Sequence, residues 1–365
     1  MKLAILSVTY NGCLLAERLA VALGGNADVY AKAGRHLAHS KHVFTSLSET
    51  VEKLFPVYDG LVFIMATGIV VRVIAPHIRD KRVDPAVVVV DERGQYAISL
   101  LSGHIGGAND LSHAVAEAIG AQPVITTATD VGNLPAADVL AVKLGLTIEP
   151  FENLKQINAA IVHGERVAFF VDSDLACYST YCRQAEGLGV NLAAMSEAER
   201  TETYDYAVMI TDKEFQLIKP HLYLRPRTLA VGIGCRRGVA ASAILAVISK
   251  ACLSVGRSPS SIALIGSTVV KSDEQGILTA AAELDVPTVF FTNEQLQQCI
   301  EKHQLECSPF VGQQIGVGNV CEPAALVGAQ ANSLLLPKTI FPQITIAIAE
   351  ATSRLSVSGQ AVRKI

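Results

Sequence analysis

The chain has 365 residues, of which 50% are hydrophobic and 18% charged, and its net charge at neutral pH is −4. This length predicts two or three domains, and an acidic balance with 5% aromatic residues and no tryptophan disfavours nucleic acid as a partner. A mean hydropathy of +0.36, without a signal sequence or an apolar run of about 20 residues, predicts a cytoplasmic protein with buried parallel sheets and no membrane association.

The first segment of the chain alternates predicted strands and helices. Strands are expected over 3–8, near 29–30, over 61–65, over 87–90 and over 123–125, with a helix over 14–23. The spacing of Leu111 and Val115 predicts a further helix, for which Asn109 or Asp110 is the expected N-cap. Such alternation is typical of a doubly wound sheet.

A glycine-rich loop with one histidine precedes that helix, in the sequence L-L-S-G-H-I-G-G-A-N-D over 100–110. Glycines let a ligand approach the backbone, and the first turn of a helix attracts an anion, although the same glycines also suit a tight turn alone. Four basic residues lie between the two preceding predicted strands, and they form either an anion site or a solvated loop. They are Arg72, Arg79, Lys81 and Arg82. Because ligands bind at the carboxyl ends of parallel strands, the ends at 66–68, 102–107 and 126–130 are expected to face one opening. The later motifs over 231–326 are expected to share it, within one chain or across a dimer.

No metal site is predicted from the cysteines or histidines. The eight cysteines are scattered without a C-x-x-C pair, which disfavours a disulfide framework or a structural zinc site. His36, His39 and His42 have metal-like spacing, but no carboxylate or cysteine is interleaved with them, so a polar loop is the favoured interpretation.

The second half begins with a weaker, more acidic stretch, with strands expected over 167–171 and 206–210 and a helix over 154–162. From 228 the strong pattern returns, in V-G-I-G-C-R-R-G over 231–238 and in strands over 262–265, 287–291 and 344–348. The glycine spacing, and the lack of an acidic residue about 20 positions later, disfavour a dinucleotide-dependent oxidoreductase. Arg236 and Arg237 before a helix suit a carboxylate or phosphate, and Cys235 is either activated by them or simply packed. Pro323 is expected at the first position of a late helix.

The predicted fold is a multi-domain α/β protein, with parallel or mixed sheets and flanking helices in the N-terminal and C-terminal domains and a smaller α/β middle domain. The predicted boundaries are 1–134, 135–227 and 228–354, with a tail over 355–365.

Several long motifs in order resemble the CbiG-type proteins, the cobalt-precorrin-5A hydrolases of anaerobic cobalamin biosynthesis. They are G-L-V-F-I-M-A-T-G-I-V-V-R (60–72), K-R-V-D-P-A-V-V-V-V-D-E-R-G (81–94), L-L-S-G-H-I-G-G-A-N-D-L (100–111), V-I-T-T-A-T-D (124–130), V-G-I-G-C-R-R-G (231–238), K-S-D-E-Q-G (271–276) and V-C-E-P-A-A-L (320–326). The resemblance implies a hydrolase that opens the ring A δ-lactone of a cobalt-bound, ring-contracted tetrapyrrole. Acetaldehyde is released, and cobalt-precorrin-5B is the product.

The same resemblance implies the cofactors and partners. Cobalt would arrive inside the substrate, so no cofactor or metal of the protein's own is expected. The expected ligand is a small-molecule corrinoid, and a homodimer and transient contacts with neighbouring cobalamin-pathway enzymes are left open. The alternative function is a non-catalytic carrier of corrinoid intermediates.

The chemistry of this reaction then selects candidate residues. Lactone opening needs a base and oxyanion donors, for which His104, with a pKa near about 6.5, and the amides of Gly106 and Gly107 are expected. Asp110, Asp130 and Glu322 are alternative bases, and the predicted catalytic residues are His104, Asp110 and Glu322. The carboxylates of the substrate need cations and polar donors around a wide cleft. The predicted substrate-binding residues are Thr67, Gly68, Arg72, Lys81, Arg82, Ser102, Gly103, Gly106, Gly107, Asn109, Thr127, Asp130, Gly234, Cys235, Arg236, Arg237 and Lys271.

Overall fold

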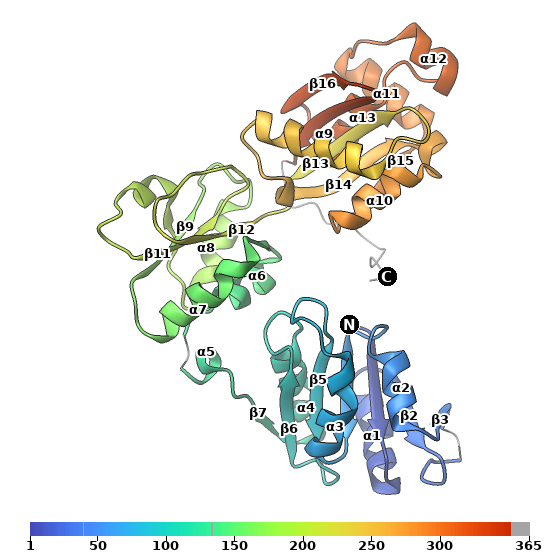
Figure 1. Ribbon diagram of the computed structural model, residues 1–365, viewed down its shortest axis with the longest axis vertical. Coiled ribbons are helices and arrows are strands. Elements are labelled where there is room, and N and C mark those ends of the chain that lie inside the picture. The colour runs from blue at the N-terminus through green and yellow to red at the C-terminus, as the bar shows by residue number, and fades with distance from the viewer. Residues whose placement is uncertain (39, 133, 352–365) are drawn as a thin grey trace. The chain divides into compact units, whose positions relative to one another are not determined.

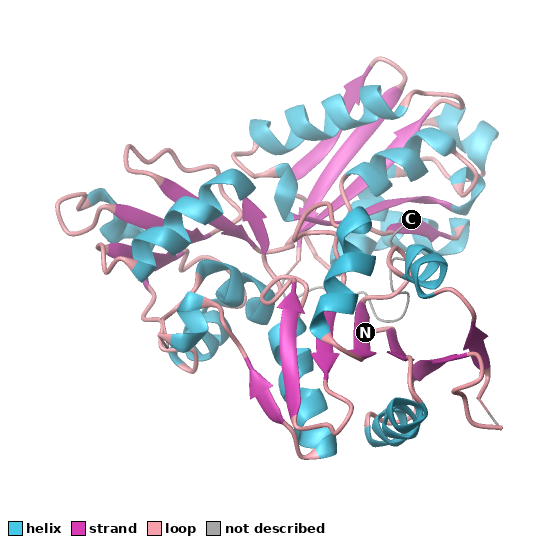
Figure 2. Ribbon diagram, turned by 60° about the horizontal axis from the view of Figure 1, so that its bottom comes forward, coloured by secondary structure: helices cyan, strands magenta, loops and turns pink. Residues whose placement is uncertain are grey.

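The computed structural model describes residues 1–38, 40–132 and 134–351. His39 and the predicted tail over 355–365 lie outside the described residues. Contacts divide the chain into two compact units, Met1–Val142 and Lys143–Ile365. The first unit contains one sheet and the second contains two, each flanked by helices (Figures 1 and 2). The predicted α/β fold class is therefore confirmed.

The first unit is built on a seven-stranded sheet with the order β3-β2-β1-β4-β5-β6-β7. Its strands are β1 (Leu3–Ser7), β2 (Ala27–Lys32), β3 (His42–Phe44), β4 (Gly60–Ile64), β5 (Ala86–Val90), β6 (Tyr96–Leu101) and β7 (Gln122–Val124). Its helices are α1 (Tyr10–Ala22), α2 (Leu47–Leu54), α3 (Thr67–Ile74), α4 (Ala108–Ile119), α5 (Ala128–Val131) and α6 (Ala137–Leu144), the last of which ends just beyond the unit.

Both faces of this sheet are buried, which is why its central strands are continuous apolar runs. Val62 and Val88 pack on one face in a cluster with α1 and α4, whereas Phe63 and Val89 pack on the other face in a cluster with α2 and α3. Successive side chains of a strand point to opposite faces, so a strand between two helical layers needs an apolar residue at every position.

The direction of β6 overturns one prediction from the sequence. Strands β1 to β5 are mutually parallel, but β6 is antiparallel to β5, with Val87 opposite Leu101 and Val90 opposite Ala97, and β7 is parallel to β6. The carboxyl ends of β6 and β7 therefore lie at the edge of the sheet where β4 and β5 begin. The ends at 66–68 and 102–107 lie at opposite edges, and the expectation of a single opening is wrong for this unit. The short turn over 91–95 permits this hairpin, whereas a parallel connection needs a longer crossover.

The second unit contains two five-stranded sheets. The middle sheet has the order β10-β9-β11-β12-β8, and the third sheet has the order β15-β14-β13-β17-β16. Their strands are β8 (Thr147–Glu149), β9 (Val167–Val171), β10 (Ala193–Ala194), β11 (Tyr206–Ile210), β12 (His221–Arg225), β13 (Leu229–Cys235), β14 (Ile262–Thr268), β15 (Thr288–Phe291), β16 (Leu336–Phe341) and β17 (Ile344–Glu350). Their helices are α7 (Leu154–Val162), α8 (Tyr178–Glu186), α9 (Ala241–Ser254), α10 (Gln275–Glu283), α11 (Asn293–His303), α12 (Pro309–Ile315) and α13 (Cys321–Ala329).

In the third sheet, β13, β14 and β15 are parallel and β17 is antiparallel to β13. Helix α13 lies so close to β13 that a Cβ atom added at Gly232 would stand 1.8 Å from a backbone oxygen of the helix. Pro323 is the third residue of α13 and not the first as expected. Gly232, in the V-G-I-G-C-R-R-G motif, therefore allows the helix to pack closely on the sheet.

A buried polar network joins the middle sheet to the third. Arg225, whose side chain is 1% exposed, donates from Nε to Glu149 at 2.6 Å. The Glu149 carboxylate also accepts hydrogen bonds from the hydroxyls of Ser258 at 2.8 Å and Ser260 at 2.7 Å, across the boundary between the two sheets. Burial works against its charged form, but these hydroxyls and Arg225 together lower the pKa of Glu149.

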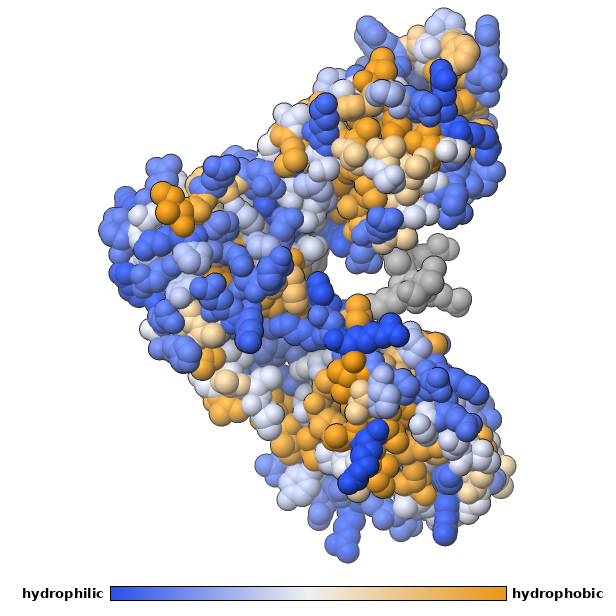
Figure 3. All heavy atoms as spheres, in the orientation of Figure 1, coloured by the Kyte–Doolittle hydropathy of each residue, from blue (hydrophilic) through white to orange (hydrophobic). Residues whose placement is uncertain are grey.

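No helix among the described residues is long and apolar enough to cross a membrane. Helix α3 still exposes apolar side chains, with Ile69 40% and Val71 46% accessible. Figure 3 shows hydrophobic residues at the surface of the first unit, where α3 lies. Arg72 belongs to this helix, where its guanidinium donates to the carbonyl of Gly68 at 3.1 Å, and not to a loop.

Candidate functional site

The glycine-rich loop folds back on itself between β6 and α4. Ser102 has a φ of 59°, and a Cβ atom at Gly106 would stand 2.3 Å from the Ser102 Cβ, so the turn requires a glycine there. The amide of Gly107 donates to the His104 carbonyl, and that of Asn109 donates to the Gly103 carbonyl, each at 3.0 Å. The Gly107 amide is thus already used, and the prediction that it holds an oxyanion is wrong.

Gly107 is also the N-cap of α4, two or three residues earlier than the predicted Asn109 or Asp110. Its φ of 85° favours glycine. Asp110 is an exposed residue in the first turn of the helix, where an acidic side chain favours the helix dipole.

His104 lies between two carboxylates from later in the chain. Its Nδ1 is 3.1 Å from Oδ1 of Asp138 on α6, and its Nε2 is 2.5 Å from Oδ2 of Asp130 on α5. The imidazole is 11% exposed and the Asp138 side chain 6%, whereas the Asp130 side chain is 37% exposed. Asp130 is therefore the member of this triad that a ligand reaches most easily.

A single oxygen of Asp130 receives all of its hydrogen bonds among the described residues. Besides His104, Asn109 donates to Oδ2 from its side-chain nitrogen at 3.1 Å, and the Thr127 hydroxyl donates to the same atom. Ser99 in turn donates to the Asn109 amide oxygen at 2.6 Å, which fixes the orientation of that side chain. Oδ2 is thus held by three donors, and Oδ1 is left to meet a water molecule or a ligand.

The two carboxylates decide the protonation state of His104. Burial opposes its positive charge, but the hydrogen bonds and charges of Asp138 and Asp130 raise the pKa of His104 to about 9. Burial also acts against the charge of Asp130, yet Thr127 and His104 lower the pKa of that carboxyl overall. His104 is therefore an imidazolium at neutral pH, and the expectation of a free base with an ordinary pKa is wrong.

The remaining candidates of the first unit divide between the two edges of the sheet. Thr67 and Gly68 begin α3 at the edge where β4 ends, away from the His104 loop. Lys81 and Arg82 are exposed and shortly precede β5, so they belong to the edge where β6 ends. Arg82 pairs there with Asp80 at 2.7 Å.

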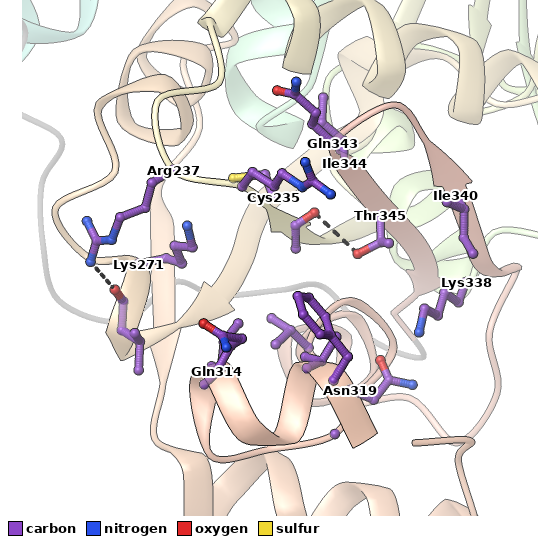
Figure 4. Close-up of a pocket in the computed structure, with 18 of the residues that line it drawn as sticks. Cys235, Arg237, Lys271, Gln314, Asn319, Lys338, Ile340, Gln343, Ile344 and Thr345 are labelled. Carbon is purple, nitrogen blue, oxygen red and sulfur yellow. Dashed lines mark hydrogen bonds between the residues drawn. The ribbon is translucent and has the colours of Figure 1, made fainter. Parts of the chain in front are cut away.

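A cavity of about 690 Å³ opens at the carboxyl ends of the parallel strands of the third sheet. It lies between the segment after β13, the segment after β14, the β16–β17 hairpin and α12 (Figure 4). Its lining residues are Gly234, Cys235, Arg236, Arg237, Val270, Lys271, Phe310, Val311, Gln314, Ile315, Gly318, Asn319, Val320, Lys338, Ile340, Phe341, Gln343, Ile344 and Thr345. The predicted Gly234, Cys235, Arg236, Arg237 and Lys271 are thus brought together.

Two of the four cations at this cavity are already neutralised. Arg237 donates to both oxygens of Asp273 at 3.0 Å, and Lys271, which is 5% exposed, donates to Glu274 at 3.3 Å. The second oxygen of Glu274 accepts the backbone amide of Gly238 at 2.8 Å. Lys271 and Glu274 therefore support the turn that follows β13.

Cys235 does not carry an activated thiolate. Burial raises the pKa of this thiol, and Lys271 and Glu274 act on it in opposite directions. The alternative of a lowered pKa is thereby wrong.

Glu322 is a buried structural residue and not a lining residue of the cavity. Its oxygens accept the side-chain amide of Asn319 at 2.5 Å and the backbone amide of Lys338 at 3.0 Å. It thereby ties two walls of the cavity to the start of α13.

Sequence reasoning missed Asp138, Asn319 and Lys338. Asp138 is remote in sequence from His104, and the predicted boundary at 134/135 assigned it to another domain. Lys338 lies on β16, which was not predicted because Pro337 interrupts its apolar pattern. A proline within a run is a signal for an edge strand, and β16 is indeed at the edge of its sheet. Among the described residues there is no grouping of three or more His, Cys, Asp or Glu side chains able to hold a metal ion.

Three family profiles match successive parts of the chain. They are described as Cobalamin synthesis G N-terminal (residues 49–130), Cobalamin biosynthesis central region (135–226) and Cobalamin synthesis G C-terminus (229–349).

Individual relatives match nearly the whole chain. A protein of Salmonella typhimurium named cobalt-precorrin-5A hydrolase is 34% identical over 355 residues, covering 96% of this chain and 97% of the relative. A protein of the same name from Priestia megaterium is 32% identical over 358 residues, covering 95% and 94%. Among solved structures, a cobalamin biosynthesis protein G homolog from Sulfolobus solfataricus is 22% identical, with a TM-score of 0.39 and coverage of 95% and 96%.

Proposed function

The chain belongs to the cobalamin synthesis G family, and on that premise we propose that it is a cobalt-precorrin-5A hydrolase whose lactone chemistry takes place at the Asp130–His104 edge of the first sheet. The observation that carries the function is the 34% identity to a hydrolase of that name over 96% of this chain and 97% of the relative. All three family regions are present, and they follow one another in order along the chain.

The reaction is the hydrolytic opening of the ring A δ-lactone of cobalt-precorrin-5A, followed by release of acetaldehyde to give cobalt-precorrin-5B. Cobalt enters as part of the substrate, and we expect the protein to need no cofactor of its own. The tasks of the protein are to hold the macrocycle, to accept and return a proton at the lactone, and to stabilise developing negative charge.

Asp130 is the group proposed to touch the reacting water. As the water oxygen adds to the lactone carbonyl carbon, Oδ1 of Asp130 accepts a proton from it. The carbon–oxygen bond of the lactone then breaks, and Asp130 returns the proton to the departing alkoxide, which becomes a hydroxyl. A carboxylate with a lowered pKa is a weak base in water, but a bound macrocycle covers its 37% exposed side chain, and desolvation raises a carboxyl pKa.

His104 is proposed to orient Asp130 rather than to react. Both of its nitrogens face carboxylates and its side chain is 11% exposed, so it donates to Oδ2 of Asp130 and leaves Oδ1 for the water. Its positive charge also favours the oxyanion that forms nearby. Lys81, exposed at the same sheet edge, adds positive charge for the carboxylates of the substrate.

The second step releases the two-carbon fragment. Asp130 accepts the proton of the new hydroxyl, the adjacent carbon–carbon bond breaks, and acetaldehyde leaves. The electron pair of that bond passes to the conjugated macrocycle, which takes up one proton. One water is consumed for each acetaldehyde that is released.

The experiment that tests this function is the incubation of the purified chain with cobalt-precorrin-5A. Acetaldehyde release is followed with an NADH-coupled alcohol dehydrogenase, and the mass of the corrinoid product is measured. We expect stoichiometric release with wild-type protein and a loss of about 10²–10⁴-fold in kcat for Asp130→Asn, the range for removal of a general base. Tight binding of the substrate without any acetaldehyde would instead favour the non-catalytic carrier.

A further inference from the structure

Two of the four cations at the cavity of the third sheet remain available to a ligand. Among the described residues, the guanidinium of Arg236 and the ammonium of Lys338 make no hydrogen bond or ion pair, in contrast to Arg237 and Lys271. Arg236 follows β13, whereas Lys338 lies on β16. Figure 4 shows Lys338 on the opposite side of the cavity from Arg237 and Lys271. The cavity therefore presents unused positive charge on two separate walls.

Large apolar side chains lie at the same cavity and are left open to solvent. Phe310 on α12 is 68% exposed and Ile340 on β16 is 75% exposed, and both line the cavity together with Ile315 and Phe341. Exposed apolar groups beside a cavity mark a ligand or partner surface. The combination fits a ligand with an apolar body and anionic groups around its rim.

Lys338 and Asn319 are held in place by a single buried carboxylate. Glu322, which is 8% exposed, accepts the backbone amide of Lys338 and the side-chain amide of Asn319. Asn319 is itself 1% exposed and donates a further bond to the Glu306 carbonyl at 2.9 Å. The walls of the cavity are thus fixed before any ligand enters, which lowers the entropic cost of binding.

We infer that this cavity binds the macrocycle of an acidic corrinoid, with its apolar face against Phe310 and Ile340 and its peripheral carboxylates on Arg236 and Lys338. Arg237 and Lys271 shape the site without contributing to affinity, because each already neutralises a carboxylate of the chain. This inference rests on the proposed function for the class of ligand. It deepens that function by distinguishing binding cations from structural ones.

The test uses the full-length chain and two probes in calorimetric titrations. One probe is a corrinoid whose peripheral carboxylates are free acids, and the other is the same corrinoid with those groups converted to methyl esters. We expect Arg236→Ala and Lys338→Ala each to weaken binding of the free acid by about tenfold or more, the effect of losing a hydrogen bond to a charged group. The ester should bind weakly, and equally to all variants.

Two control variants separate specific contacts from net charge. Arg237→Gln removes a cavity cation that is already paired, and Lys302→Ala removes an equal charge on α11, outside this cavity. Both should change the affinity for the free acid by less than about threefold. Thermal melting of each variant verifies its fold, and Arg236→Lys and Lys338→Arg should restore most of the lost affinity.

Several results would overturn the inference. These are equal binding of the acid and the ester by wild-type protein, no effect of Arg236→Ala and Lys338→Ala, or a loss with Arg237→Gln as large as theirs. Acetaldehyde release on the same preparations separates this failure from failure of the proposed function. Release without acid-selective binding removes only the cavity inference, and binding without release removes only the hydrolase.

Discussion

The protonation state of His104 gives the most direct test of the proposed site. If Asp130 and Asp138 hold its ring as the structure shows, its pKa is about 9, and the replacement of either carboxylate by asparagine should lower that value. Asparagine keeps the size of the side chain but removes its charge. We expect a decrease of about one pKa unit or more for each single variant, because the two carboxylates share the shift.

The magnitude follows from the shift in the His104 pKa. A rise from 6.5 to about 9 corresponds to about 3 kcal/mol of tighter proton binding in the folded chain, and screening by water around the 37% exposed Asp130 reduces this to about 2 kcal/mol. Because the folded-state pKa is raised, this stabilisation is fully present below pH 6.5 and is lost as the pH rises through 9. The rate of acetaldehyde release should be constant from pH 6 to 8. It should fall above about pH 9, as His104 loses the proton with which it orients Asp130.

The assay is an NMR titration of the chain labelled with ¹⁵N-histidine, which contains nine histidines. The signal that disappears in His104→Asn identifies residue 104, and Asp110→Asn is a control that leaves both carboxylates of the triad in place. The reasoning is refuted if every wild-type histidine titrates between about pH 5.5 and 7.5. It is also refuted if the acetaldehyde rate rises through such a value, because His104 would then act as an ordinary base.

Three further predictions concern the fold and the second unit. Gly232→Ala should destabilise the protein by more than about 3 kcal/mol, because its Cβ would overlap a backbone oxygen of α13. Gly312→Ala should be tolerated, because the nearest neighbouring atom to its added Cβ is 3.9 Å away. Urea unfolding of both variants tests this. Glu149→Gln should cost about 3 kcal/mol by leaving the buried Arg225 without its main counter-charge, and an unchanged unfolding midpoint would contradict the importance of the network. Glu322→Gln should raise KM and leave kcat within about tenfold of the wild-type value, since this carboxylate positions two cavity walls. A fall in kcat of about 100-fold at constant KM would instead indicate that Glu322 is a catalytic residue.

The sequence alone determined the central buried strands and most of the chemical groups. Continuous apolar runs such as Val87 to Val90 marked the strands, because a strand buried on both faces needs an apolar residue at every position. The glycine-rich loop, His104 and the arginines after β13 were likewise visible as local patterns. These features depend on neighbours close in the chain, and local patterns report them well.

Tertiary structure decided which groups meet and in what state. The reversal of β6 moved the His104 loop to the opposite sheet edge from Gly68, which no pattern within β6 itself specifies. Asp138 lies 34 residues after His104 in the sequence but contacts it in the fold. Its carboxylate helps to make His104 an imidazolium instead of the predicted neutral base, since a pKa depends on charges in space. In the same way Asp273 and Glu274 neutralise two of the cavity's cations and leave Arg236 and Lys338 for a ligand.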